Sequence, residues 1–329
     1  MQKIILILLL IVLQSSGLFS QDIGNSFHKS MIMVGVYAEQ EKIFADSVGQ
    51  YSYKQVFMRT NVPFLVKTYK TDQLLKFKLL QLSWDAAASL GFPDISFISK
   101  QHSQYYLMTG LSGFYYNGAK SIWLGSLHTS ISEDNYSISD PSLRFNGYIC
   151  YIHNSGKLFD YNIGIAYTYL FGNTLVLPVL GFHSHFNDKW KLTVNLPFKT
   201  SLLYKPNKST DLEFFIAPAG NQSSFSSKGF IDTTPDLVLR LQKQQYQTGL
   251  DWKFNKKSAV SFDLRAGILL GRKLIFIDDQ NTLSETGIKN SGFILAGITF
   301  KFGKPAQNKN ERLEILDDLL EYFDASDLE

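Results

Sequence analysis

The sequence predicts an all-β protein, a closed antiparallel transmembrane β-barrel of about 12 strands with a short C-terminal helical tail. Three observations lead to this fold class. An apolar leader opens the chain, long stretches alternate apolar and polar residues, and the last such stretch ends in alternate aromatic residues. Hydrophobic residues make up 45% of the chain and are interleaved with polar ones. Such interleaving suits strands that have one apolar and one polar face.

Residues 1–20 have the order of a secretory signal peptide. Lys3 precedes an apolar run from Ile4 to Leu13, and small and polar residues follow up to Ser20. This run is much shorter than the roughly 20 apolar residues that a helix needs to cross a bilayer. We therefore expect cleavage after Ser20 and export of the mature chain. A retained anchor or a buried core helix is the alternative.

The clearest predicted strand lies at 159–172. Its odd-numbered residues from Phe159 to Phe171 are all apolar, whereas the residues between them are mostly small or polar. A period of two over this length indicates a strand and not a helix. The stretch exceeds a usual soluble strand and reaches the roughly 9 to 11 residues that cross a bilayer at a tilt.

Two further alternating stretches, 245–254 and 260–269, are separated by a short polar turn and predict an antiparallel hairpin. Noisier candidate strands complete the set, at 31–38, 53–68, 74–84, 104–116, 121–132, 143–153, 175–186, 190–204, 210–218 and 292–302. Bacterial single-chain barrels have an even number of strands. The candidates therefore predict about 12 strands, with about 10 and about 14 as alternatives.

The predicted connections alternate in length. Tight polar turns are expected at 117–120, 154–157 and 187–189. Longer connections are expected at 85–103, 133–142, 219–236 and 279–291.

Three positions interrupt the regular pattern. Pro178 and Pro197 fall inside candidate strands, where each removes a ladder donor, so we expect bulges or strand ends there. Between Leu241 and Tyr246 the apolar residues change from odd to even positions. A bulge or short break near Lys243 is the simplest explanation.

A soluble β-sandwich would also show alternation. Long strands, Tyr and Phe near the ends of the apolar face, and an opposite face that is small and polar favour the membrane barrel.

The final predicted strand, GFILAGITFKFG at 292–303, resembles the closing strand of outer-membrane barrels. Together with LFSQ at 18–21, NDKWKLTVNLPFKTSLLY at 187–204 and DWKFNKKSAVSFDLRAG at 251–267, it makes the chain similar to an uncharacterised outer-membrane β-barrel family of the Bacteroidota, a domain of unknown function. The resemblance covers roughly residues 31–303 and implies a barrel domain at 21–303 in the cell outer membrane. One departure is that residues 304–329 follow the aromatic strand, which ends the chain in many barrels.

The acidic tail at 304–329 has a helical pattern. Asn308 and Glu311 have the spacing of an N-cap and its N3 partner, and an apolar stripe follows at Leu313, Leu316, Leu320 and Phe323. Eight acidic and three basic side chains give the tail a net charge of −5. We expect an amphipathic helix that lies against the barrel or its mouth, with a periplasmic protein as the alternative partner.

The rest of the mature chain, residues 21–303, carries a net charge of +7. Scattered solvated lysines such as Lys256 and Lys257 explain much of this excess. A lumen that favours anions, or contacts with lipopolysaccharide phosphates, are the alternatives.

His183 and His185 are the best candidates for chemistry, because both imidazoles lie on one face of a predicted strand. A metal site needs a third ligand and a hydrolase needs an oriented nucleophile, so a polar lumen pair is expected instead. The sequence has no P-loop, GxSxG or HExxH motif. We therefore predict no catalytic, cofactor-binding or metal residues, and Cys150, the only cysteine, is expected to be a packed side chain.

The expected function is a pore or channel for small solutes. A plugged barrel with a structural or interaction role is the alternative, and a lipid-modifying enzyme that uses His183 or His185 is a weaker one. The expected partners are outer-membrane lipids and lipopolysaccharide. Nucleic acid is not expected, because the chain lacks a dense basic stripe.

Overall fold

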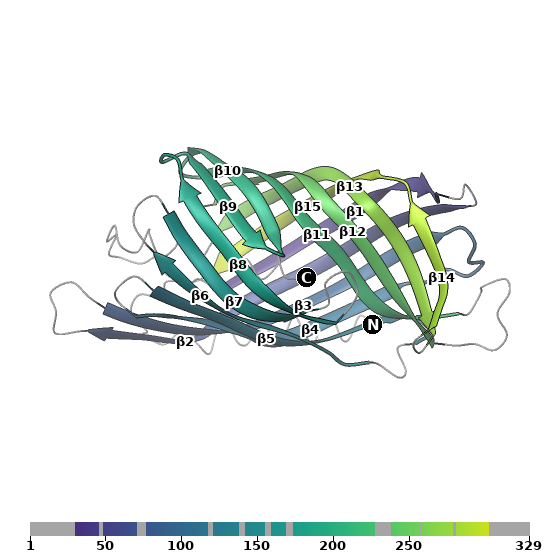
Figure 1. The fold of residues 1–329 in the computed structure, drawn as a ribbon, viewed down its shortest axis with the longest axis horizontal. Coiled ribbons are helices and arrows are strands. Elements are labelled where there is room, and N and C mark those ends of the chain that lie inside the picture. Colours follow the sequence, from purple (N-terminus) through teal and green to yellow (C-terminus); the bar gives the residue numbers. More distant parts are fainter. Residues whose placement is uncertain are drawn as a thin grey trace.

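The computed structural model describes residues 30–302, apart from gaps at 46–48, 71–76, 118–120, 138–141, 155–158, 169–173, 228–237, 257 and 279–280. Every helix or strand within these ranges is a β-strand (Figure 1). None of the described residues forms a helix long and apolar enough to cross a membrane. The predicted signal peptide at 1–20 and the predicted helical tail at 304–329 lie outside the described residues.

The strand segments are β1 (Ser30–Ile43), β2 (Gln50–Lys70), β3 (Phe77–Ile95), β4 (Gln104–Tyr116), β5 (Ser121–Asp134), β6 (Arg144–Asn154), β7 (Phe159–Thr168), β8 (Leu175–His185), β9 (Trp190–Leu196), β10 (Lys199–Asn207), β11 (Thr210–Ser226), β12 (Val238–Phe254), β13 (Val260–Asp278), β14 (Asn281–Ile288) and β15 (Ser291–Phe302).

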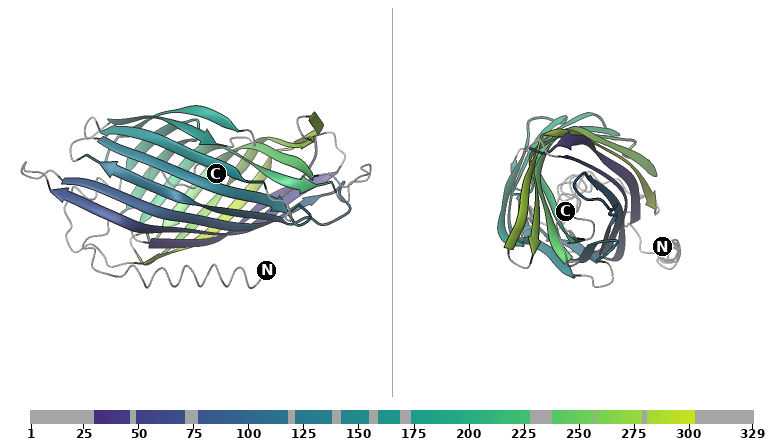
Figure 2. Two further views of the ribbon diagram at one scale, coloured as in Figure 1. Left: turned by 90° about the horizontal axis from the view of Figure 1, so that it is seen from below. Right: turned by 90° about the vertical axis from the view of Figure 1, so that its right-hand side faces the viewer.

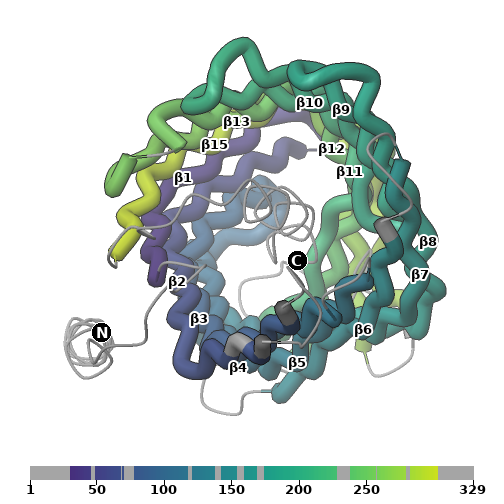
Figure 3. The backbone as a smooth tube through the Cα atoms, turned by 90° about the vertical axis from the view of Figure 1, so that its left-hand side faces the viewer, coloured from purple at the N-terminus to yellow at the C-terminus, as the bar shows by residue number. Residues whose placement is uncertain are grey.

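These segments close into one antiparallel barrel. Each strand from β1 to β13 pairs with the next, and β15 pairs with both β13 and β1. Figures 2 and 3 show the resulting ring along its axis. β14 and β15 pair with successive parts of β13 and are separated only by Lys289 and Asn290, so they are two segments of one strand. The barrel therefore has 14 strands, the upper alternative of the sequence prediction.

The two ends of the barrel differ. Ser30 pairs with Phe302 at one end, here called the termini end. The turns predicted at 117–120, 154–157 and 187–189 all join consecutive strands at this end. The opposite end, where β1 stops at Ile43, is called the far end. In Figure 1, β9 and β10 lie towards the termini end, whereas β14 lies at the far end.

Three predicted loops are partly strand. β3 continues to Ile95, β11 continues to Ser226, and β14 occupies most of 279–291. The loop predictions at 85–103, 219–236 and 279–291 were therefore too long. The apolar residues at the ends of these strands point inwards, as described below, which breaks the alternation that marked the rest of each strand.

Pro197 lies at a strand end, as predicted. The segment 190–204, expected as one strand, is a hairpin of β9 and β10 that turns at Pro197 and Phe198, with a cis peptide bond before the proline. Pro178 differs from the prediction, because it lies inside β8 in regular register with Ile165. It is tolerated there because the described pairing of β8 with β9 starts only at Leu180.

The predicted irregularity near Lys243 is present. The register between β12 and β13 shifts between Gln244 and Tyr246, opposite Gly271, whose φ is 58°. A positive φ suits glycine and is common at β-bulges. The predicted cause is wrong, however, because odd-numbered side chains of β12 are buried on both sides of the shift, as at Leu241 and Asp251. The apolar residues of β12 change face because the barrel interior itself changes from polar to apolar.

Candidate functional site

The half of the barrel next to the termini end has an apolar outer face. On β7, Ile163 is 54% exposed, whereas its neighbour Asn162 is only 2% exposed. The same alternation places Tyr167 outwards and Thr168 inwards, as the sequence predicted. Large exposed apolar side chains on the other strands continue this face around the barrel. We call this part of the molecule the belt half, because such a face matches the hydrocarbon core of a bilayer.

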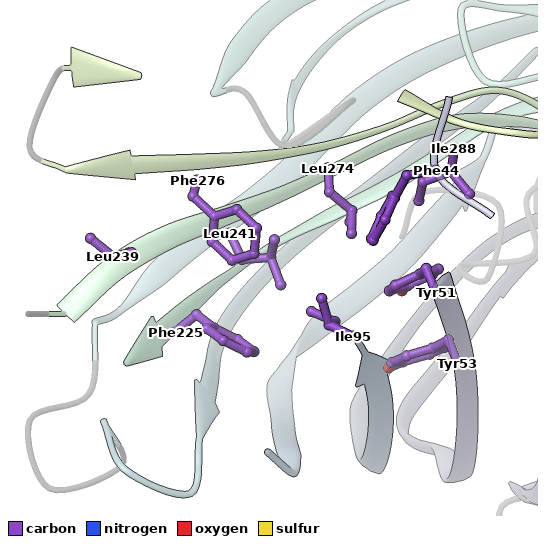
Figure 4. Close-up of a cluster of buried hydrophobic side chains, with 10 residues drawn as sticks. All are labelled: Phe44, Tyr51, Tyr53, Ile95, Phe225, Leu239, Leu241, Leu274, Phe276 and Ile288. Atoms are coloured by element: carbon purple, nitrogen blue, oxygen red, sulfur yellow. The ribbon is translucent and has the colours of Figure 1, made fainter. Parts of the chain in front are cut away.

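The far half has its apolar residues inside. The far-half core is a cluster of buried side chains that come from six strands and one loop and point towards one another (Figure 4): Phe44, Tyr51, Tyr53, Ile95, Phe225, Leu239, Leu241, Leu274, Phe276 and Ile288. Charged side chains point outwards in this half at Lys54, Arg240 and Lys273, beside some exposed apolar ones such as Leu283. The far half is thus built like a small soluble barrel whose interior is filled.

A buried ion network lies beside the far-half core. Glu39 accepts hydrogen bonds from Lys243 and from Arg272, whose Nη2 lies 2.5 Å from Oε2 of Glu39. The Lys243 ammonium also lies 4.5 Å from the ring centre of Tyr53. Burial lowers the pKa of Lys243, against the opposing effect of the Glu39 carboxylate. Removing one partner of such a network leaves a buried charge unpaired, which is strongly destabilising.

A polar seam closes the far half between β5 and β11. Ser224 forms a single parallel bridge with Glu133, and Arg144 at the start of β6 joins the two strands. Its Nη1 lies 3.4 Å from the Glu133 carboxylate and its Nη2 donates to the Ser224 hydroxyl at 3.2 Å. The seam joins β5 directly to β11, although β6 to β10 lie between these two strands in the sheet order.

Asp134 anchors the same seam. It accepts hydrogen bonds from Nδ1 of His102 at 2.7 Å and from the Ser226 amide at 2.8 Å, while the His102 ring stacks on Phe225 with ring centres 4.1 Å apart. Burial alone would raise the pKa of the Asp134 carboxyl. The hydrogen bonds from His102, Ser226 and Ser137 outweigh burial and hold this pKa below its usual value.

On the termini-end side of the seam, β8 and β11 each have an edge without a described partner strand. β8 pairs with β9 only from Leu180 onwards, so its edge at 175–179 has no described partner on that side. β11 pairs with β10 only up to Ile216, so its edge at 217–222 is in the same position. We call this interruption of the described ladder the wall gap. The turn at Pro197 and Phe198 borders the wall gap on the side of the termini end.

One side of the belt-half interior is apolar. The apolar stripe consists of the buried residues Leu79, Phe114, Ile122, Leu124, Cys150, Ile152, Ala166, Val179 and Phe198. Its central members lie in register across neighbouring strands, because Phe114 is opposite Leu124 and Leu124 is opposite Cys150. The stripe runs across the strands from Phe198 at the wall gap to the termini-end residues of β3, β5 and β6.

The opposite side of the interior is charged. Lys199 and Glu213 form an ion pair at 3.2 Å, and Arg265 and Asp251 form another at 2.8 Å. The Asp251 Oδ1 on this side and the Asp160 Oδ1 on β7, a strand of the stripe, have no hydrogen-bond donor within the described part of the chain. The belt half therefore encloses an amphipathic interior, with one apolar and one ionic wall.

A family model described as Domain of unknown function (DUF6268) matches residues 111–299. The chain belongs to this family. The matched range runs from β4 into β15 and includes the seam, the wall gap and most of the apolar stripe. The predicted membership of a domain of unknown function is confirmed, and the Bacteroidota origin stays a prediction. No curated protein matches the DUF6268 chain.

Several solved barrels are similar to this DUF6268 chain in fold. An outer membrane channel from Pseudomonas putida F1 has 11% identity and a TM-score of 0.44, with 86% of this chain and 98% of that chain covered. The P. putida toluene transporter TodX has 8% identity and a TM-score of 0.30, covering 84% and 91%. The transport unit of the Escherichia coli autotransporter AIDA-I has 9% identity and a TM-score of 0.30, covering 88% and 95%. At these values the likeness concerns the general form of the barrel and carries no functional conclusion.

The structure places both predicted histidine candidates of the DUF6268 chain on β8. The His183 side chain is buried, and its Nδ1 lies 3.4 Å from the Thr193 hydroxyl. His183 is also paired with Asp160 on the neighbouring strand β7. The described residues contain no group of three His, Cys, Asp or Glu side chains that could hold a metal ion. Full burial also keeps His183 away from lipid, so the geometry gives no support to a lipid-modifying site.

Sequence reasoning missed the residues that organise the far half. Glu39 and Arg272 lie just beyond the predicted strands at 31–38 and 260–269, and Asp134 lies in the predicted connection at 133–142. The available signal was the presence of ionisable residues beside apolar ones at strand ends, as in the Glu133 and Asp134 pair.

Proposed function

We propose that this chain is a channel for small solutes in the cell outer membrane. The observation that carries the proposal is the ionic inner wall of the belt half. One oxygen of Asp251 in this wall, Oδ1, and the Oδ1 of the buried Asp160 on β7 have no hydrogen-bond donor in the described part of the chain. Buried polar atoms are normally satisfied by protein, water or ligand. A barrel of 14 strands is also wider than the roughly eight-stranded barrels that side chains fill. These two facts support a hydrated lumen.

The proposed route does not pass through the far half. It leaves the barrel sideways, through the wall gap. The far-half core fills the axial path with ten buried side chains, so solutes moving straight along the barrel would have to displace it. The wall gap lies below that core and beside the apolar stripe at Val179 and Phe198. This geometry favours small solutes with an apolar face, which can follow the stripe while polar groups meet the ionic wall.

Single-channel conductance of purified protein in planar bilayers tests the function. To test the route, Ala219→Cys at the wall gap and Leu283→Cys on the exposed outer face of β14 are compared in a Cys150→Ser background. A bulky thiol reagent should reduce conductance through the Ala219→Cys barrel and leave the Leu283→Cys barrel unchanged. Equal responses would remove the lateral route, and absence of conductance in every variant would remove the channel.

A plugged barrel with a structural or interaction role is the second candidate, and the far-half core favours it. A filled interior at one end is what a barrel without transport requires. The two candidates differ in conductance and in liposome swelling with small solutes, both of which would be absent for a plugged barrel.

The proposed location also implies contacts with lipopolysaccharide. Lys54 and Lys100 are exposed beside an outer-surface cavity of about 420 Å³, which also contains Asp94 and Ser99. The cavity lies on the far half, above the apolar outer face, where phosphate groups of the outer leaflet would be found. Lys54→Glu with Lys100→Glu should lower the amount of lipopolysaccharide that copurifies, whereas Lys273→Glu serves as the control on another strand.

A further inference from the structure

The interior of the belt half has more hydrogen-bond acceptors than its own donors satisfy. Within the described ranges, six buried amide or carboxylate oxygens have no hydrogen-bond partner: Gln81 Oε1, Asn146 Oδ1, Asp160 Oδ1, Asn162 Oδ1, Asp251 Oδ1 and Asp263 Oδ1. No buried amide, ammonium or guanidinium nitrogen of the same ranges lacks a partner. Buried polar atoms are normally satisfied by protein, water or ligand. The partners that these oxygens need must therefore be donors.

The basic side chains of the ionic wall are already engaged. Nε and Nη2 of Arg265 both donate to Oδ2 of Asp251, at 3.3 and 2.8 Å, and leave its Oδ1 without a donor. Lys199 pairs with Glu213 at 3.2 Å. Arg265 and Lys199 also lie 5.0 and 5.8 Å from the ring centre of Phe215. Each of these cations is thus held by a carboxylate and by a ring of the wall.

The two aspartates of the β12–β13 hairpin are neighbours. Asp251 is opposite Arg265 and Asp263 is opposite Lys253, so the two carboxylates are diagonal neighbours on the inward face. They interact electrostatically with each other. Lys253 and Arg265 offset their charges from the sides, but both Oδ1 atoms stay unsatisfied. Two like charges in such proximity favour a positively charged donor between them.

This aspartate pair can be reached from the lumen. Arg265 and Glu213 both lie opposite Asp251, one on each neighbouring strand. Their side chains are 18% and 16% exposed, whereas Asp251 itself is 1% exposed. The aspartate pair therefore lies just behind the accessible surface of the ionic wall.

The net charge of the barrel does not contradict a site for cations. Residues 21–303 carry a net charge of +7. Part of this excess lies on exposed connections between strands, at Lys100, Lys189, Lys208 and Lys289. The sign of the whole barrel is therefore no guide to the sign that its interior favours.

An ammonium group has the chemistry that the aspartate pair lacks. It carries three donors and a positive charge, and its hydrogen bonds to carboxylates are charge-assisted. The described residues contain no group of three His, Cys, Asp or Glu side chains that could hold a metal ion. A neutral hydroxyl would satisfy an oxygen without offsetting the two charges, and an anion would add a third like charge.

We propose that Asp251 and Asp263 form a site in the lumen for the ammonium group of a small organic cation. The two Oδ1 atoms accept hydrogen bonds from the ammonium group, while Arg265 holds Asp251 in position through Oδ2. That such cations are also transported rests on the proposed channel function, whereas binding to the aspartate pair does not.

Binding is tested on the purified full chain with n-butylammonium as the probe and 1-butanol as the uncharged control. A ligand that binds only the folded barrel stabilises it. n-Butylammonium should therefore raise the temperature at which the folded band is lost in heat-modifiability gels, and 1-butanol should not. Asp263→Asn should remove this rise. Glu285→Gln, which neutralises an exposed carboxylate on β14, should keep it.

Asp251→Asn is the second variant and should also remove the rise, which keeps the test valid where Asp263→Asn does not fold. In planar bilayers, n-butylammonium should reduce the potassium current, and Asp263→Asn should raise the concentration needed several-fold. Absence of a rise in the unmodified chain, or an equal rise in both Asn variants or with 1-butanol, would overturn the site. A rise that depends on Asp263 in a protein without conductance would retain the site and reject the channel.

Discussion

The belt half and the far half use the same strands in opposite ways. β13 crosses both halves, and its Leu264 and Ile268 point outwards in the belt half. Beyond Gly271, its Leu274 and Phe276 point inwards and are 1% exposed. The backbone bulge at Gly271 rotates the strand by one residue between the two halves. The surroundings therefore decide which face is apolar, because lipid outside requires apolar residues there and water outside requires them within.

The two halves also differ in what their interiors contain. Outward polarity lets the far half stand in water, and its filled interior makes it a rigid cap. Both halves have ionisable residues inside, but in the far half these residues lie beside an apolar core, whereas in the belt half they line part of the interior. The wall gap lies at the boundary between the halves, and it is the side opening of the proposed channel.

Removal of a large side chain from the far-half core should have the largest effect. Phe276→Ala should cost about 3 to 5 kcal/mol of far-half stability, because Phe276 is 1% exposed and the change leaves a cavity. Ile163→Ala, which truncates a lipid-facing side chain, should cost far less. Urea unfolding followed by protease susceptibility of the far half measures both. Equal costs would mean that the far half has no core of its own.

An arginine introduced on the outer face should have different effects in the two halves. Ile163→Arg should destabilise the barrel by about 2 to 4 kcal/mol if the site lies near the bilayer midplane. Leu283→Arg in the far half starts from a similar exposure, 51% against 54%, and should be tolerated. The readout is the fraction of heat-modifiable protein in outer membranes. Similar losses for both changes would place lipid around the far half as well.

Acid should loosen the seam. The folded-state pKa of Asp134 is lowered, so its contribution to stability is present above the unfolded pKa of about 3.9 and is lost as pH falls through the folded value. Far-half stability should therefore decrease below about pH 4. Asp134→Asn should be less stable at neutral pH and show a smaller further decrease in acid. An unchanged pH profile in the variant would assign the acid sensitivity to other carboxyls.

Deletion of the tail should have the smallest effect on the barrel. Truncation after Gly303 leaves the pairing of β15 with β1 and β13 intact, so heat-modifiable migration should be unchanged. Conductance, or the set of copurifying proteins, should change instead. A truncated chain that fails to assemble would show that the fold extends beyond Gly303.

The sequence predicted the belt half well. At 159–168 and 292–302 the side chains alternate regularly between the outer face and the interior, and the structure has β7 and β15 there. The hairpin of β12 and β13 was also predicted. These strands could be recognised because the same face is apolar along most of their length.

The far half was not predictable in the same way. Its strand extensions at 85–95 and 219–226 bury polar residues such as Asp85 and Ser223 and place large apolar residues inside only near their ends, at Ile95 and Phe225. The pattern of the belt half therefore does not continue into them. The seam joins Glu133 with Ser224, which are far apart in the sequence and leave no local periodic signal. The hairpin at Pro197 was read as one strand because both of its arms alternate, and only the proline marked the turn.

The contact between Ser30 and Phe302 has a consequence for biogenesis. The first and last described strands are neighbours, so the ring cannot close until the chain up to Phe302 is available for pairing. Every shorter intermediate exposes two unpaired sheet edges, one on β1 and one on the most recently formed strand, and such edges invite pairing with other chains. A stalled or prematurely terminated chain would consequently be a substrate for chaperones and proteases, and the full ring is the first species free of that hazard.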